Sequence, residues 1–365
     1  MSAPAATTAE TRRDALTERL FEATVGALEL LSVHIGWRLG LYQALVAGPA
    51  TEAELAERAG IDARYTREWL EQQAVAGILE VDDADADPEL RRFSLPAGHE
   101  EVLAVADSAA HVAPFGPMIV GIAGAMPAVI EAYRSGEGVP YERYGADFRD
   151  GQGAINRPAF VNETAAWIAS MPEVDARLRD DGEPARVADV GCGQGHSTLA
   201  IASAYPRARV EGIDLDPASI EDAASLARAA GQSDAVEFRV ADASELAASG
   251  PYDLVCIFEA LHDMSRPVEV LEALRAALAP GGSVLLADER VAESFTAPGD
   301  EVERIMYGWS VTHCLPVSLA EQPSAALGTA LRPGTVAELA KAAGFASFEV
   351  LGIENDFFRF YRLAG

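Results

Sequence analysis

Apolar residues recur at spacings of three and four near the start of the chain, between Asp14 and Val46. This period is typical of an amphipathic helix that carries its apolar side chains on one stripe. The stripe must pack against the rest of the chain or against a partner subunit, and it comprises Leu16, Leu20, Phe21, Val25, Leu28, Leu31, Ile35 and Leu39. Residues 1–16 are rich in alanine and threonine, lack the apolar core of a signal peptide and predict a disordered tail.

The next segment, Thr51–Leu95, combines helical and strand patterns. Thr51 followed by Glu54 is a capping-box signal for the start of a helix. We expect two helices, at Ala53–Arg58 and Arg64–Ala76. Two strands should follow, at Gly77–Val81 and Arg91–Leu95, joined by an acidic loop at Asp82–Glu89. This order predicts a helix-turn-helix with a wing.

Residues 111–180 have a helical pattern interrupted by proline and glycine. The most apolar run, Phe115–Ile130, contains Pro117 and Pro127, and predicts a pair of helices over a pocket instead of a membrane span. An aromatic loop over Pro140–Gly145 and another helix over Pro158–Pro172 follow. We expect this segment to roof an active site.

Short β-rich runs alternate with helical segments from Ala185 onward, which predicts a parallel sheet covered by helices. The last two strand runs leave almost no room for a connection, so they must form an antiparallel hairpin. The fold class is therefore α/β, a Rossmann-like seven-stranded sheet with an antiparallel last strand, plus a mainly α-helical winged-helix domain. We expect domains over 1–110, 111–180 and 181–365. The seven strand runs are Arg186–Val190, Arg209–Ile213, Val236–Val240, Tyr252–Phe258, Ser283–Ala287, Phe348–Ile353 and Phe357–Leu363.

Composition narrows the possible partners. The formal net charge is −29, and in residues 1–110 acidic residues outnumber arginines about two to one. Because binding to DNA phosphates requires a positive face, we expect the winged domain to serve dimerisation and not DNA binding. The three cysteines are far apart, which argues against a disulfide framework or a cysteine zinc site. We expect a cytoplasmic protein that binds neither nucleic acid nor membrane.

A glycine-rich loop follows the first strand of the sheet. Its glycines, Gly191, Gly193 and Gly195, let the backbone turn tightly and approach a ligand. A dinucleotide site would need a glycine at the position that His196 holds. Asp189, two residues before the loop, would repel a pyrophosphate but could pair with an ammonium group. S-adenosylmethionine carries an ammonium group and no phosphate.

Two further acidic residues follow the next two strands. Asp214 lies nineteen positions after Gly195, where a carboxylate can accept both ribose hydroxyls, and Asp242 could accept from an adenine amino group. With these three acids in order, the C-terminal half resembles class I S-adenosylmethionine-dependent methyltransferases over about residues 185–365. The resemblance implies that the cofactor contacts Asp189, Gly191, Cys192, Gly193, Gly195, Asp214, Leu215, Asp242, Ala243 and Phe258.

A histidine follows the fourth strand, in the run Leu261-His262-Asp263. An imidazole there could remove a proton from a hydroxyl, since its ordinary pKa suits a base near neutral pH. The run, with the later Leu278–Gly282, resembles small-molecule O-methyltransferases that carry a winged-helix dimerisation domain. The resemblance implies that His262 is the general base, that Asp288 supports it and that the chain forms a homodimer. Met264 departs from the tryptophan of plant members.

The later run Tyr307–Ser318 resembles orphan actinobacterial members of the same family. We expect a substrate pocket lined by Met306, Tyr307, Trp309 and His313, a hydroxyl or phenol of secondary metabolism as acceptor, and no metal.

Three alternative interpretations of the function remain open. His262 could cap a helix or line the pocket while methyl transfer to nitrogen or carbon proceeds without a base. A winged-helix regulator could sense S-adenosylmethionine through the same loop, although the acidic N-terminal charge argues against DNA binding. A nicotinamide dehydrogenase is disfavoured by His196 in the glycine loop.

Overall fold

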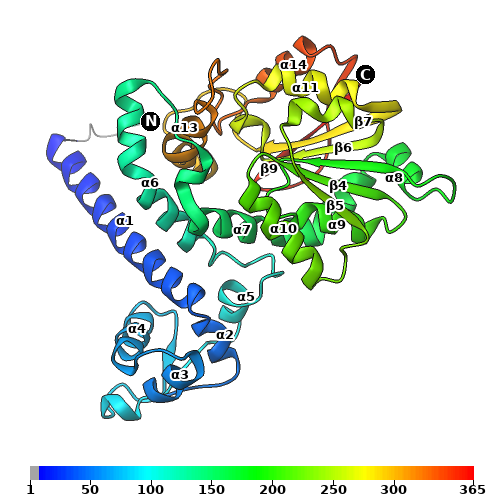
Figure 1. Ribbon diagram of the computed structural model, residues 1–365. Coiled ribbons are helices and arrows are strands. Elements are labelled where there is room, and N and C mark those ends of the chain that lie inside the picture. Colours follow the sequence, from blue (N-terminus) through cyan, green and yellow to red (C-terminus); the bar gives the residue numbers. More distant parts are fainter. Residues whose placement is uncertain (1–7) are drawn as a thin grey trace, which may run out of the picture. The chain divides into compact units, whose positions relative to one another are not determined.

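The structure is a computed structural model that describes residues 8–365 (Figure 1). Residues 1–7 of the expected tail lie outside the described residues. The tail prediction is wrong for the rest of that segment, because helix α1 begins at Ala9 with Thr8 as its cap. The chain divides into two compact units, one ending at Val120 and the other beginning at Gly121.

Short helices and a small wing form the first unit. Gly40, in the left-handed conformation at φ 67°, separates α1 from α2, so the single expected helix is two. The capping box is confirmed, since Thr51 and Glu54 each accept the other's backbone N–H. The wing strands pair antiparallel but are only two residues long each. The elements are α1 (Ala9–Arg38), α2 (Leu41–Val46), α3 (Glu52–Ala59), α4 (Ala63–Val75), β1 (Glu80–Val81), η1 (Pro88–Leu90), β2 (Phe93–Ser94) and α5 (His99–Leu103).

The apolar stripe of α1 is exposed to solvent in the described chain. Phe21 is 71% exposed and Leu28 is 62% exposed. The core of this unit lies elsewhere, around Tyr42, Trp69 and Leu70. The other exposed members of the stripe are Leu16, Leu20, Val25, Leu31, Ile35 and Leu39.

The expected pair of helices at Phe115–Ile130 is wrong, because one helix, α6 (Phe115–Ser135), runs through the whole segment. Pro117 lies in its first turn, where a missing N–H costs nothing, and Pro127 is accommodated inside. Within the described residues, α6 is the one helix long and apolar enough to cross a membrane by length and composition, with 39% of the relevant window buried. Buried core helices share these properties, so this is weak evidence for a span.

Two helices and a turn lead from α6 into the sheet. The aromatic loop is the short turn η2 (Tyr141–Tyr144), and α7 (Gly145–Ala169) passes through Pro158 without ending. The expected helix at Pro158–Pro172 is thus the second half of a longer one. It is followed by α8 (Pro172–Leu178).

Seven strands form the sheet of the second unit, in the order β5-β4-β3-β6-β7-β9-β8. The first five in this order are parallel, and β9 is antiparallel to both β7 and β8. The predicted fold class is confirmed, including the antiparallel last strand. The strands are β3 (Arg186–Val190), β4 (Arg209–Asp214), β5 (Val236–Val240), β6 (Tyr252–Phe258), β7 (Leu278–Glu289), β8 (Ser347–Val350) and β9 (Phe358–Ala364).

Helices and turns connect these strands. Asp216 caps α10 by accepting the backbone N–H groups of Ala218 and Ser219, and Pro217 occupies the first helical position. The connecting elements are α9 (His196–Ala204), α10 (Pro217–Ala229), η3 (Ala243–Ala248), η4 (Leu261–Asp263), α11 (Pro267–Ala276), α12 (Glu301–Trp309), the π-helical turn η5 (Ser310–Cys314), α13 (Leu315–Ser318) and α14 (Pro333–Ala342).

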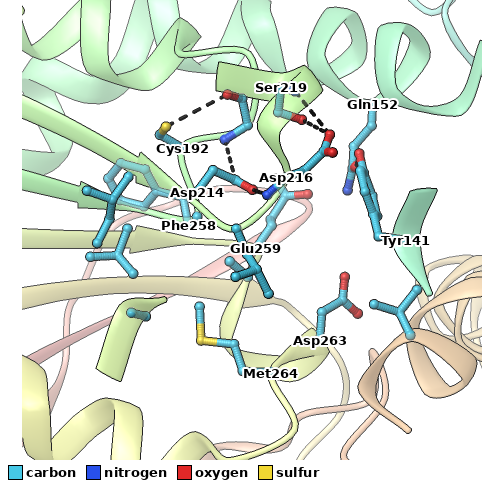
Figure 2. Close-up of a pocket in the computed structure, with 18 of the residues that line it drawn as sticks. Tyr141, Gln152, Cys192, Asp214, Asp216, Ser219, Phe258, Glu259, Asp263 and Met264 are labelled. Carbon is cyan, nitrogen blue, oxygen red and sulfur yellow. Dashed lines mark hydrogen bonds between the residues drawn. The ribbon is translucent and has the colours of Figure 1, made fainter. Parts of the chain in front are cut away.

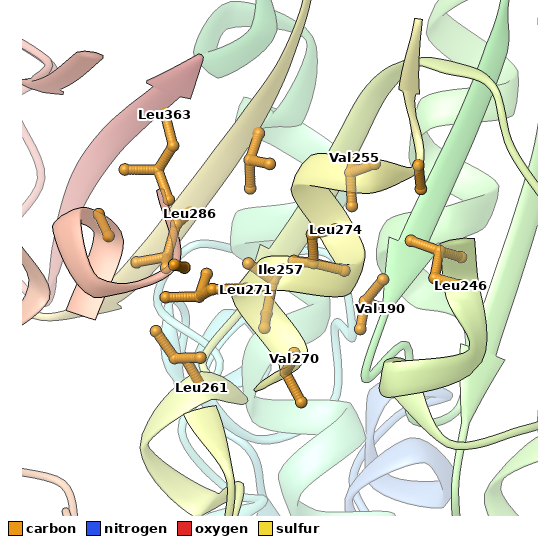
Figure 3. Close-up of a cluster of buried hydrophobic side chains, with 14 of the residues drawn as sticks. Val190, Leu246, Val255, Ile257, Leu261, Val270, Leu271, Leu274, Leu286 and Leu363 are labelled. Carbon is orange, nitrogen blue, oxygen red and sulfur yellow. The ribbon is translucent and has the colours of Figure 1, made fainter. Parts of the chain in front are cut away.

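Both faces of the central strands β3 and β6 and of the second half of β7 are buried, and this explains why these strands are mostly apolar, whereas the edge strands β5 and β8 are partly exposed. Val255 and Ile257 of β6 pack with residues of α11 and α14 on one face (Figure 3). Leu254 and Cys256 pack on the other face with residues of α7, α8 and α9. The carboxyl ends of the central strands remain open for a site.

Candidate active site

A cavity of about 730 Å³ opens at the carboxyl ends of β3, β4, β5 and β6 (Figure 2). Open α/β sheets bind ligands at this edge. Residues of η2 and α7 form another part of its wall, namely Tyr141, Arg149, Gln152, Asn156 and Phe160. The cavity therefore combines loop residues of the sheet with the segment that we expected to roof an active site.

The glycine loop has the backbone that its sequence predicts. Gly191, Gly193 and Gly195 all adopt positive φ, at 71°, 50° and 78°. A Cβ at Gly195 would lie 2.7 Å from the ring of Phe238, so the helix α9 can begin there only with glycine. A Cβ at Gly193 would meet nothing within 4 Å, and this residue lines the cavity.

Asp214, at the end of β4, ties the glycine loop to the neighbouring strand. Its Oδ2 accepts the backbone N–H of Gly193 at 2.8 Å, and its Oδ1 accepts that of Asp216 at 2.9 Å. Burial raises the pKa of this carboxyl, while the backbone donors lower it. The side chain lines the cavity next to Leu215, so a ligand there meets an acceptor whose geometry is fixed.

Asp189 does not line the cavity, although we expected it to contact the cofactor. It is fully buried, and its Oδ2 accepts the hydroxyls of Ser197 and Thr198 at 2.6 Å each. Burial raises its pKa to about 6, against the effect of the two hydroxyl donors. In this structure its contacts hold the start of α9 beneath the glycine loop.

Most other residues assigned to the cofactor line the cavity. Cys192, Ala243 and Phe258 do so, together with Asp242, which caps η3 by accepting the backbone N–H of Ser244 at 2.8 Å. Gly195 shapes the loop but is not part of the lining.

His262 is buried between two carboxylates. Its Nδ1 lies 2.9 Å from Oδ1 of Asp288, and its Nε2 lies 3.4 Å from Oδ1 of Asp263. Burial alone would lower the pKa of the imidazole, but the charges of Asp288 and Asp263 outweigh it and raise the pKa well above its usual value. Asp263 lines the cavity, whereas His262 and Asp288 lie behind it.

Glu259 lines the cavity directly after β6, in a left-handed conformation at φ 51°. Asn156 Nδ2 donates to its Oε2 at 3.1 Å. Burial raises its pKa to about 7, although the nearby His262 lowers it. Glu289, which is also buried, has a pKa raised well above its usual value by burial and then by Glu259.

Comparison with known families assigns a segment in each half of the chain. Residues 182–324 match the family described as a methyltransferase domain, and residues 26–104 match an Rv2258c-like winged HTH domain. The chain is a methyltransferase-domain protein. Its N-terminal domain is a winged helix-turn-helix.

Individual relatives agree with this assignment. Trans-aconitate 2-methyltransferase of Streptomyces avermitilis is 34% identical over 140 residues, which are 38% of this chain and 49% of that protein. The chain thus spans about half, or less, of the length of the first curated relatives that it matches.

Two solved structures share the fold along nearly the whole chain. Mitomycin 7-O-methyltransferase MmcR is 20% identical with a TM-score of 0.64, and the match covers 98% of this chain and 100% of that one. Human N-acetylserotonin methyltransferase, in complex with SAM, is 17% identical with a TM-score of 0.61, and the match covers 96% and 97%. These likenesses support the class I methyltransferase fold with a winged-helix domain.

The methyltransferase domain implies S-adenosylmethionine as its cofactor, and the cavity fits that molecule. The open space beside Gly193 allows a ligand to approach the backbone, and Asp214 and Asp242 offer acceptors for hydroxyl and amino groups. The lining arginines are already close to carboxylates, since Arg149 Nε lies 2.9 Å from Asp222 and Arg266 Nη2 lies 3.9 Å from Asp242.

The four residues expected at the substrate do not line this cavity: Met306, Tyr307, Trp309 and His313. His313 is buried behind it, stacked on Phe148 with ring centroids 4.1 Å apart and edge-on to Tyr141, which does line the cavity. Burial lowers the pKa of His313 to about 3, so this imidazole is neutral. Tyr307 accepts from Arg332 at 3.3 Å through its hydroxyl.

Three buried groups near His262 were given no role from the sequence. Glu259 and Glu289 each follow a strand that we had predicted, but an acidic residue at a strand end does not reveal its own burial. Cys314 is distant in sequence, yet its sulfur and ligand atoms of His262 and Asp263 all lie within 4.8 Å of one another. This group has a composition that can hold a metal ion, which the sequence did not predict.

Proposed function

We propose that the protein is an S-adenosylmethionine-dependent methyltransferase that methylates a hydroxyl or phenol of a small molecule. The cofactor supplies an electrophilic methyl group on a sulfonium. The glycine loop, Asp214, Asp242 and Phe258 bind and orient it, and residues of η2 and α7 roof the site. The pairing of His262 with Asp288 beside a cofactor-sized cavity carries the proposal.

His262 takes the proton of the acceptor hydroxyl in this proposal, which requires its Nε2, now buried beside Asp263, to reach the cavity in the complex. Asp288, at 2.9 Å, fixes the proton on Nδ1 and so leaves Nε2 as the accepting atom. Asp263 lies 3.4 Å from Nε2, and its own pKa is raised by burial to about 6. Because both carboxylates favour the imidazolium, His262 must first lose its extra proton, for which Asp263 offers a neighbouring acceptor.

Met306, Tyr307, Trp309 and His313 remain candidates for the substrate side in this proposal. The stacking of His313 against the cavity-lining segment η2 and α7 supports an indirect role, in which it positions the aromatic wall. Contact with the acceptor would require these residues to reach the cavity in the complex.

The protein forms a cytoplasmic homodimer in this proposal and acts on a small molecule, not on nucleic acid. The exposed apolar stripe of α1 supports self-association, since a continuous apolar face in water is a typical interaction surface. The net charge of −29 disfavours binding to nucleic acid phosphates.

Calorimetry with S-adenosylhomocysteine and NAD side by side tests the cofactor, and binding of NAD alone would contradict the proposal. Methyl transfer from labelled S-adenosylmethionine to members of a metabolite library tests the activity. His262→Ala should reduce kcat by about 10²–10⁴-fold with unchanged cofactor affinity, because it removes a general base. A full rate in this variant would favour base-free transfer to nitrogen or carbon.

A further inference from the structure

Three hydrogen bonds join the glycine loop to the helices α7 and α10. In the loop, Gln194 donates through Nε2 to Oδ1 of Asp150 in α7 at 3.1 Å and to Oδ2 of Asp222 in α10 at 3.2 Å. Arg149, also in α7, donates through Nε to the same oxygen of Asp222 at 2.9 Å. These contacts connect the loop with two helices that are distant from it in sequence, and we call the four side chains the clasp.

Gly153, one turn after Arg149 in α7, makes room for the clasp. A Cβ at this position would overlap Oε1 of Gln194, so a larger residue must displace the Gln194 side chain. Glycine weakens a helix interior, and the backbone does not need it here, since Gly153 is not among the glycines with positive φ. The glycine is therefore explained by the close approach of Gln194.

The clasp lies on the wall of the cavity, where Gln194, Arg149 and Gly153 all line it. The side chain of Arg149 is 19% exposed and that of Asp222 is 39% exposed, so water reaches the contacts. Polar contacts that water reaches are individually weak and can open and close. Every donor and acceptor of the clasp belongs to the protein, so the clasp favours the closed arrangement with or without a bound cofactor.

Pro158 divides α7 into two parts. It has no N–H and so removes one backbone hydrogen bond inside the helix. Arg149 and Gly153 precede it and line the cavity. Trp167 and Ile168 follow it and are buried in the core beside the sheet. The part that carries the clasp can therefore tilt while the other part stays packed.

We propose that Gln194 is a positioning residue that holds the first part of α7 on the glycine loop, and that opening of the clasp sets the rate of cofactor exchange. This inference rests on the proposed binding of S-adenosylmethionine in the cavity. The clasp opens for entry and for release alike. Weakening it should therefore increase both rate constants and leave Kd almost unchanged. A residue that contacts the ligand directly would instead affect mainly koff and Kd.

Surface plasmon resonance with the full chain and S-adenosylhomocysteine measures both rate constants, and calorimetry measures Kd. Gln194→Ala removes the amide that donates to both carboxylates. We expect kon and koff each to increase about tenfold, the effect of a lost hydrogen bond to a charged group, with Kd within about threefold of the wild type. Gln232→Ala is the matched control, because it removes a glutamine amide that donates to Ser203 outside the cavity lining.

Gly153→Ala is the second variant, and it keeps every group of the clasp in the chain. Its Cβ displaces the Gln194 amide while alanine strengthens the helix, so exchange should become faster with little change in the melting temperature. A purely structural role of Gln194 would not produce this result. In the Gln194→Ala background, Gly153→Ala has no amide to displace and should add no further increase.

The inference is overturned if the rate constants of Gln194→Ala and Gly153→Ala match those of the wild type. It is also overturned if only koff and Kd increase, since Gln194 would then be a direct ligand contact, or if the effects of the two substitutions simply add. Should Gln194→Ala not fold, Gly153→Ala alone decides. Failure of the wild type to bind S-adenosylhomocysteine would instead refute the proposed function.

Discussion

Replacement of Asp214 by alanine should weaken the cofactor more than any other single change at the glycine loop. The side chain accepts two backbone N–H groups, from Gly193 and Asp216, and faces the cavity. Without it the loop loses its anchor to β4, and the ligand loses its charged acceptor. We therefore expect effects on both binding and stability.

The magnitude follows from the number of hydrogen bonds. Two ribose hydroxyls that donate to a carboxylate are worth about 1.5–3 kcal/mol each. Their loss corresponds to a decrease in affinity of about 10²–10⁴-fold. The backbone donors of Gly193 and Asp216 lose their acceptor as well, which should reduce the free energy of unfolding by about 1–3 kcal/mol.

Calorimetric titration with S-adenosylhomocysteine measures the affinity, and thermal unfolding measures the stability of each variant. Asp214→Asn keeps one acceptor oxygen and should fall between the wild type and Asp214→Ala. Asp234→Ala, at an exposed position, is the control for a lost carboxylate. A folded Asp214→Ala variant that binds with wild-type affinity would refute the placement of the ribose at this residue.

Three further changes test other parts of the molecule. A general base acts only when unprotonated, so kcat should rise as pH increases through the raised pKa of His262. Asp288→Asn removes a negative charge that raises this pKa, so the rise in kcat should move to lower pH. A pH–rate profile that does not move would argue against His262 as the base. Gly195→Ala should lower the free energy of unfolding by at least about 1 kcal/mol, because φ is 78° and the Cβ would crowd an aromatic ring, and an unchanged melting curve would contradict this. Phe21→Asp combined with Leu28→Asp should convert a homodimer to monomers in sedimentation experiments, and an unaltered dimer would exclude the α1 stripe as the interface.

The strands of the sheet could be predicted closely from the sequence. The central strands of a parallel sheet are buried on both faces, so each is a short apolar run between turn signals, and Tyr252–Phe258 matches β6 residue for residue. The helices of the roof were harder to predict. Whether Pro127 and Pro158 interrupt a helix depends on the packing around each one, and both lie inside continuous helices.

The candidate site also has features that the sequence predicts and features that depend on the tertiary structure. The positive φ of the glycine loop is a local property, and residue type and spacing alone predicted it. The orientation of Asp189 is not local, since Ser197 and Thr198 reach its carboxylate only once α9 has docked on β3. The sequence identified the acid but not the direction in which it points.

The sequence by itself determined the α/β fold, the glycine loop and the place of Asp214 at a strand end, because each depends on local periodicity or on the order of strand ends. The pairing of His262 with Asp288 was implied by the resemblance to small-molecule O-methyltransferases. Only the tertiary structure decided that Glu259 and Asp263 lie on the cavity wall close to His262, and that His313 lies behind it. Burial and charge depend on neighbours distant in sequence. For the same reason, the group of buried acids around His262 became visible only after the chain was folded.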